Sequence, residues 1–239
     1  DSRSLRALRK DMQFIFQDPY SSMNPKMTIR DIVIEPLDNY RRDLSVSEKE
    51  KLVGDLLEMV GLTRDVMRRY PHEFSGGQRQ RVVIARGIAL NPKFVVCDEV
   101  VSALDVSVQA QVINLLASLK RKLSLTYLFI SHDLRVIRHV SDRIMVLYLG
   151  QVMEVAKSSD LFGNPLHPYT QSLMGSISKG DPRNRQERIV LRGEIPSPLN
   201  VPPGCPFSTR CPIATQRCTT EKPPLEKKGD EHLVSCWFA

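Results

Sequence analysis

A serine, two glycines and a glutamine occupy positions 75–78, directly before a helix-like run that ends near Leu90. Glycine lets a backbone approach an anion closely, and the first amides of a helix have no acceptor within the helix. These amides and the positive end of the helix dipole favour a bound phosphate. The candidate phosphate-binding residues are therefore Ser75, Gly76, Gly77 and Gln78. The same sequence is also compatible with an ordinary serine-capped helix after a tight turn.

Two consecutive carboxylates, Asp98 and Glu99, follow the apolar run at 94–97. Carboxylates at the end of a buried strand lose hydration, and a metal ion with a polarised water offsets that loss. In phosphoryl transfer, one such carboxylate holds Mg²⁺ and its neighbour positions the attacking water. The alternative interpretation is a pair of exposed acids in a loop.

Polar residues also end two other apolar runs: Gln17 follows the first of them and His132 closely follows the run at 126–130. A histidine at such a position can donate to a terminal phosphate or orient the attacking water. A neutral glutamine can ligate Mg²⁺ or contact the water. Each residue taken alone is also typical of a structural hydrogen bond at a strand end.

The apolar patterns indicate which elements must position these side chains. We expect strands at 12–17, 94–97 and 126–130, the last two buried on both faces, and Cys97 as a small core residue. Helical spacing is present at 47–60, 79–90, 108–123 and 134–140, and 143–155 is expected to form a hairpin. This alternation implies parallel strands with crossover helices, and ligands bind such sheets at the carboxyl ends of the strands.

Composition describes an ordinary globular chain of 239 residues, 41% of them hydrophobic, with a formal net charge of +7. No apolar run approaches the length of a membrane span, and the first residues resemble no secretion signal, so we expect a cytosolic protein. Basic residues are scattered without the interleaved aromatic residues that stack on bases. A solvated basic surface is therefore favoured over a nucleic-acid site.

The order of these motifs resembles that of the nucleotide-binding subunits of ABC transporters, over about residues 10 to 155. The resemblance implies an α/β fold of the P-loop NTPase type, with a parallel-sheet core and a helical signature subdomain. It also implies a role for each matching residue. Gln17 resembles the Q-loop glutamine, Ser75, Gly76, Gly77 and Gln78 the signature, Asp98 the magnesium aspartate, Glu99 the general base, Asp105 the D-loop aspartate and His132 the switch histidine.

The chain departs from the family pattern in three places. Val100 replaces the usual proline after the two carboxylates, and Phe74 stands where leucine is commoner before the signature. The sequence contains no G-x-x-x-x-G-K-[ST] loop, which in the family precedes the Q-loop by several tens of residues. We therefore expect a truncated ABC ATPase domain that does not bind ATP tightly alone. In this family ATP lies between two subunits, and the signature of one caps the γ-phosphate held by the other.

Further segments narrow the resemblance to the ATPases of oligopeptide/dipeptide (and nickel) importers. They are residues 17–25, 164–170 and 196–198, together with the tail that contains Cys205 and Cys211. Eleven of the 16 prolines fall between Pro165 and Pro224. We therefore expect an ATPase domain at 1–155, with its helical subdomain at roughly 20–85, and a proline-rich C-terminal extension at 156–239.

Four of the five cysteines lie in this extension: Cys205, Cys211, Cys218 and Cys236. In a cytosolic chain such a group favours a metal site over disulfides. The spacing is not the close pairing of zinc ribbons, and it suits a [4Fe–4S] cluster. Zn²⁺ and unliganded or disulfide-paired thiols remain alternatives.

The sequence therefore predicts an ATPase subunit, with ATP and Mg²⁺ as cofactors, that energises uptake of oligopeptides, dipeptides or a related small solute. The resemblance implies a second ABC ATPase subunit, identical or different, and transmembrane permease subunits as partners, with a solute-binding protein reached indirectly. It also implies a peripheral location on the cytoplasmic face of the membrane. One alternative is an incomplete subunit that offers only its signature to a partner's ATP. The other is an ABC-type DNA-maintenance ATPase with a cysteine metal module, suggested by the basic pI.

Overall fold

The computed structural model describes residues 2–176, 193, 194 and 196–239. It contains two compact units, Asp1–His132 and Asp133–Ala239. In the part of the chain that the structure describes, no helix is both long enough and apolar enough to cross a membrane.

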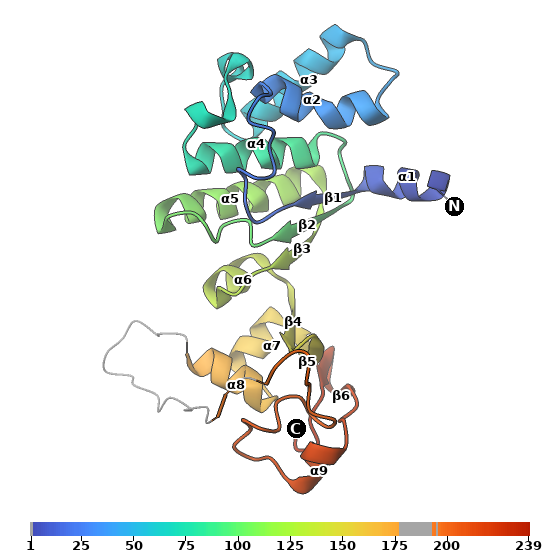
Figure 1. Cartoon of the computed structure of the whole chain (residues 1–239), viewed down its shortest axis with the longest axis vertical. Helices are drawn as coiled ribbons and strands as arrows, with labels where there is room; N and C mark the ends of the chain where they lie inside the picture. Colours follow the sequence, from blue (N-terminus) through green and yellow to red (C-terminus); the bar gives the residue numbers. More distant parts are fainter. Residues whose placement is uncertain (1, 177–192, 195) are drawn as a thin grey trace. The chain divides into compact units, whose positions relative to one another are not determined.

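A parallel three-stranded sheet forms the base of the first unit (Figure 1). Its strands are β1 (Met12–Ile15), β2 (Phe94–Asp98) and β3 (Thr126–Ile130), in that order across the sheet. Ile15 pairs with Cys97, and Asp98 pairs with Ile130. Because all three strands run the same way, their carboxyl ends meet at one edge, which confirms the predicted parallel arrangement.

The helices of the first unit are α1 (Ser2–Asp11), α2 (Ile29–Tyr40), α3 (Val46–Met59), α4 (Gly76–Ile88) and α5 (Val106–Leu123), with short 3₁₀ turns η1 (Arg64–Arg68) and η2 (Pro71–Glu73). Helices α2 to α5 are layered on one side of the sheet, and α1 extends away from the start of β1 (Figure 1). Helices α4 and α5 lie next to the sheet, and α2 and α3 lie beyond α4. The buried side chains Ile15, Val95 and Cys97 face this helical layer, as expected for Cys97.

The prediction that the second and third strands are buried on both faces is wrong. In β3, the side chains of Leu128 and Ile130 are 49% and 44% exposed, and in β2 Val96 is only half-buried. Within the first unit, helices α4 and α5 cover one face of the sheet, and the alternate side chains on the other face remain accessible.

Side-chain caps fix where three helices begin. Ser45 and Ser75 each form a capping box with the residue three positions later, and Asp105 caps α5. The helix predicted from Arg79 therefore starts at Gly76, because the Ser75 hydroxyl caps the first turn by accepting from the Gln78 amide, despite the two glycines. The helix predicted from Val108 starts at Val106 for the same reason.

The second unit is built on an antiparallel sheet ordered β4-β5-β7-β6. Its strands are β4 (Arg143–Tyr148), β5 (Gln151–Lys157), β6 (Glu226–Gly229) and β7 (His232–Val234), and its helices are α6 (Leu134–Val140), α7 (Ser158–Gly163), α8 (Pro168–Gly175) and α9 (Gln216–Thr220). The predicted hairpin is confirmed as β4 and β5. The domain boundary that we expect between 155 and 156 from the proline content falls inside β5. Strand β5 also pairs with β7 near the end of the chain.

A buried carboxylate joins three segments of this unit. Glu154 is fully buried and accepts hydrogen bonds from the backbone N–H groups of Leu166 (2.8 Å) and His167 (3.0 Å). The Nε2 atom of His232, on β7, lies 2.7 Å from the Glu154 carboxylate. These contacts satisfy a charge that is costly to bury alone, and they tie β7 and the segment before α8 to β5.

Candidate functional site

The backbone of Glu99 is held in an unusual conformation at the end of β2. Its φ angle is +44°, in the left-handed region that non-glycine residues seldom adopt. Its N–H donates to the carbonyl of Ile130 (2.9 Å), and its carbonyl accepts from the N–H of Ser102 (3.0 Å). The chain thus turns sharply after the strand and fixes the position of this carboxylate.

Side chains from the two outer strand ends converge on the Glu99 carboxylate. The Nε2 group of Gln17 donates to Glu99 Oε2, and the Nδ1 atom of His132 lies 2.8 Å from Glu99 Oε1. The Glu99 side chain is 24% exposed and that of His132 is 74% exposed. One carboxylate is therefore held from both sides yet is open to solvent, which suits a group that accepts a proton from water.

Asp98 occupies the last position of β2 and is half-buried. Because side chains alternate along a strand, Asp98 lies on the sheet face opposite to Cys97. Asp98 directly precedes Glu99 in the sequence, and both residues lie at the edge where the three strands end. A carboxylate here is a suitable oxygen ligand for Mg²⁺, which binds through one or two carboxylates and phosphate oxygens.

The signature forms the first turn of α4. Ser75 Oγ accepts from the N–H of Gln78 (3.3 Å), and Gln78 Oε1 accepts from the N–H of Ser75 (3.0 Å). This reciprocal pair uses the Gln78 amide and leaves the first-turn N–H groups of Gly76 and Gly77 without acceptors in the helix. The geometry is the one expected of a phosphate-binding helix start.

Close packing on α5 explains one of the two glycines. A Cβ atom at Gly77 would lie 2.5 Å from Val108 Cγ1, whereas one at Gly76 would meet Leu104 at an ordinary 3.6 Å. Leu104 and Val108 flank Asp105, so the signature and this segment support each other. Sequence spacing suggested Val108 only as part of a helical apolar stripe, and nothing in the pattern suggested Leu104.

Asp105 acts as the N-cap of α5. Its Oδ1 accepts from Ser107 Oγ (2.6 Å) and from the N–H of Val108 (3.0 Å). The Ser107 hydroxyl, together with the Val108 amide, holds the pKa of Asp105 below its ordinary value. This carboxylate is thus ionised and fixed beside the residues that contact the signature.

The four cysteines of the second unit gather around one small cavity. They line an enclosed space of about 20 Å³ together with Phe207 and Trp237, and all four are free thiols. The backbone also joins Cys205 and Cys218, since the N–H of Cys205 donates to the carbonyl of Cys218 (2.8 Å). Burial raises the pKa of the Cys205 thiol to about 11, and it also raises the pKa values of Cys211 and Cys236.

The predicted cysteine metal site is not supported by this arrangement. Within the described ranges, no three or more His, Cys, Asp or Glu side chains are grouped so that they could hold a metal ion. A cavity of about 20 Å³ has room for roughly one water-sized sphere. The four thiols are neighbours, but they do not form a ready-made centre.

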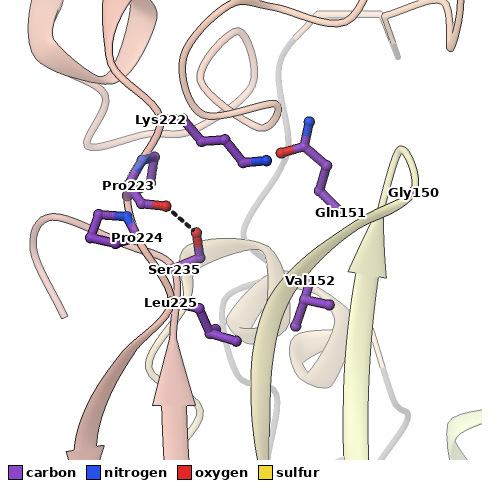
Figure 2. Close-up of a pocket in the computed structure, with 8 residues that line it drawn as sticks. All are labelled: Gly150, Gln151, Val152, Lys222, Pro223, Pro224, Leu225 and Ser235. Carbon is purple, nitrogen blue, oxygen red and sulfur yellow. Dashed lines mark hydrogen bonds between the residues drawn. The ribbon is translucent and has the colours of Figure 1, made fainter.

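A larger cavity of about 470 Å³ opens elsewhere in the second unit (Figure 2). Its lining residues are Gly150, Gln151, Val152, Lys222, Pro223, Pro224, Leu225 and Ser235. Ser235 Oγ donates to the carbonyl of Pro223 (2.8 Å), and the side chains of Lys222 and Gln151 point toward each other. None of the site residues predicted from the sequence lines this cavity, so it is no part of the candidate nucleotide site.

Two family models match the chain. The model described as ABC transporter matches residues 1–102, and the model described as oligopeptide/dipeptide transporter, C-terminal region, matches residues 153–218. The first range includes Gln17, the signature and Glu99. The second contains three of the four cysteines of the extension.

Solved structures share the fold. The dimeric structure of a post-hydrolysis state of the ATP-binding cassette MJ0796 bound to ADP and Pi superposes with a TM-score of 0.58 at 32% identity, over 66% of this chain and 68% of that one. CbiO1 from Clostridium perfringens, part of an ABC transporter complex, gives a TM-score of 0.62 at 24% identity, over 69% of this chain and 64% of that one. The second likeness concerns the fold alone.

Curated relatives match nearly the whole chain. The chain is 51% identical over 232 residues to the putative oligopeptide transport ATP-binding protein YkfD of Bacillus subtilis (strain 168), covering 96% of this chain and 70% of that protein. It is 50% identical over 233 residues to the oligopeptide transport ATP-binding protein OppF of Escherichia coli (strain K12), covering 97% and 70%. By this likeness the chain belongs to the family of oligopeptide transport ATP-binding proteins, which are ATPases of the ABC type.

Proposed function

We propose that this chain hydrolyses ATP to energise an importer of oligopeptides, with Glu99 as the general base. The observation that carries the proposal is the carboxylate of Glu99 held between Gln17 and His132 at the ends of three parallel strands. The printed names of the relatives, which describe oligopeptide transport and peptide import, support the peptide as substrate.

Each site residue then has a defined task. Glu99 accepts a proton from the attacking water, while Gln17 and His132 hold its carboxylate in place. Asp98 supplies the carboxylate for Mg²⁺, and that ion when bound neutralises charge on the phosphates. The free N–H groups at Gly76 and Gly77 donate to a terminal phosphate held by a second subunit, and Asp105 keeps the adjoining segment in register.

We propose the following partners for the chain. The signature serves a nucleotide on another ABC ATPase subunit, either a second copy or a different chain. Transmembrane permease subunits carry the solute path, and a solute-binding protein delivers the peptide to them. The chain would then lie on the cytoplasmic face of the membrane, attached through the permease.

The substrate is tested by reconstituting the complete transporter in proteoliposomes and following uptake of a radiolabelled short peptide. We expect accumulation that needs ATP on the face where the ATPases lie, and none when Glu99→Gln replaces the wild-type subunit. Excess unlabelled peptide should compete, and Ni²⁺ should not. ATP-dependent accumulation of Ni²⁺ without peptide uptake would contradict the peptide assignment.

We also propose that the four cysteines of the extension bind a [4Fe–4S] cluster. The proposal starts from the ligand chemistry of four free thiols that line one cavity, since thiolates are the soft ligands such clusters need; the thiols are not grouped as a preformed site. Since the cavity is only about 20 Å³, binding would require the cysteine-bearing segments to move apart. Such a cluster would fasten these loops to one another.

Anaerobic purification of the complete protein tests this second proposal. We expect about four iron and four sulfide per chain and broad absorption near 400 nm, all lost in Cys205→Ser. Cys97→Ser, which alters a thiol buried in the other unit, is the matched control and should keep the iron. Stoichiometric zinc without iron, or metal-free protein, would overturn the proposal.

A further inference from the structure

The chain between β1 and α2 begins with a compact turn at residues 18–23, directly after Gln17. Asp18 organises it: its Oδ1 accepts from the N–H of Tyr20 (2.8 Å), and its carbonyl accepts from Ser22 Oγ (2.6 Å) and from the Ser22 N–H (3.2 Å). Met23 at its end is only 4% exposed. These bonds make the turn a single unit, so a force on Ser22 is transmitted to Gln17.

Two arginines of α4 hold this turn. Arg86 Nη1 donates to the carbonyl of Ser22 (2.8 Å), and the guanidinium of Arg79 lies 5.5 Å from the centre of the Tyr20 ring. Arg86 Nη2 also pairs with Glu35 of α2 at 2.7 Å, so one guanidinium joins the turn, α4 and α2. Because the Arg86 side chain is 34% exposed, these bonds are partly shielded from water.

We infer that Arg86 is a positioning residue that couples the contact between Gln17 and Glu99 to the helix that carries the signature. Helix α4 starts at the signature and ends at Ile88, two residues after Arg86. A displacement of α4 therefore pulls on Ser22 and, through the bonded turn, on Gln17. The inference rests on the proposed function, because it acts through the Gln17 side chain.

The expected consequence is a fall in turnover without a matching loss of nucleotide affinity. Arg86 contacts neither the signature amides nor the Glu99 carboxylate and its two partners, Gln17 and His132. The affinity for ATP should therefore not depend on Arg86. Loss of a charge-assisted bond to Ser22 lets Gln17 drift from Glu99. In the assembled transporter, Arg86→Gln should lower kcat roughly tenfold to a hundredfold and leave KM for ATP within about twofold.

A charge swap separates positioning from simple stability. Arg86→Glu combined with Glu35→Arg restores an ion pair between α4 and α2 but offers no donor to the Ser22 carbonyl. We expect the double variant to regain the melting temperature lost in Arg86→Glu while kcat stays low. Recovery of kcat with the swapped pair would overturn the inference, because the ion pair alone would then suffice.

Arg64→Gln is the matched control. Like Arg86, Arg64 makes two guanidinium contacts in this unit, but both are with carboxylates, those of Asp55 and Glu58, and neither involves the 18–23 turn. It should lose a surface ion pair and keep normal kcat.

A normal kcat in well-folded Arg86→Gln would also overturn the inference. If Glu99→Gln, assayed in parallel, still turns over ATP, the proposed function itself fails; if it is inactive while Arg86→Gln is normal, only the inference fails.

Discussion

The candidate site depends on residues that are individually ambiguous. Gln17, Glu99 and His132 are separated by 82 and 33 positions, and each alone is compatible with a structural role. Parallel strands bring their ends together, which the sequence pattern predicts. The direct bonds from Gln17 and His132 to one carboxylate, and the left-handed backbone at Glu99, depend on side-chain geometry that no spacing encodes.

A buried histidine in the second unit gives a residue-level prediction about pH. His167 is 1% exposed, and burial lowers its pKa to about 4, an effect that Glu154 only partly opposes. Below pH 6.5 the unfolded chain gains a proton at His167 that the folded protein does not. Stability should therefore fall by about 1.4 kcal/mol per pH unit from this group between pH 6.5 and 4.

The variant His167→Asn isolates this contribution. An Asn oxygen can replace Nδ1, which accepts from the N–H of Tyr169 (3.0 Å), but it does not titrate. Denaturant unfolding followed by fluorescence of Trp237, the single tryptophan, should show a shallower loss of stability for the variant between pH 6.5 and 5. Parallel pH profiles for wild type and variant would contradict the assigned pKa.

At the scale of elements, apolar periodicity predicts most of the strands and helices. The residues at which the helices begin are set by side-chain caps, and the periodicity predicts those less well. The sequence predicts a start at Arg79, three residues after the true start of the helix at 76–88, because two glycines are poor helix formers and Val108, which packs against Gly77, is distant in sequence. The prediction that β3 is buried on both faces is wrong, because a short apolar strand has the same residue composition whether one of its faces or both are covered.

The two capping boxes allow a matched test of what the signature serine does. Ser75→Ala and Ser45→Ala each remove a hydroxyl that accepts from a backbone N–H three residues later. Each should lower the free energy of unfolding by about 1 kcal/mol. Only Ser75→Ala should also reduce ATP turnover by the assembled transporter. An equal loss of turnover in Ser45→Ala would show that stability alone accounts for the effect.

At the scale of the whole molecule, the first unit holds the candidate ATP chemistry and the second holds the family-specific extension. Proline content predicted an extension, but a hairpin that composition assigned to the ATPase part pairs with strand β7. Long-range pairing of this kind brings together segments about 80 residues apart, Glu154 and Val234 among them, and local composition cannot reveal it. Under the proposed function, the signature acts on a nucleotide held by another subunit.

The central claim is that Glu99 is the base for ATP hydrolysis in this subunit, and steady-state turnover of Glu99→Gln in the assembled transporter tests it most directly. Glutamine keeps the size and can still contact Gln17 and His132, but it cannot take the proton from water. We predict a fall in kcat by about a factor of 100 to 10,000, with ATP-dependent association of the subunits retained. Unchanged turnover in a subunit that associates normally would contradict the account.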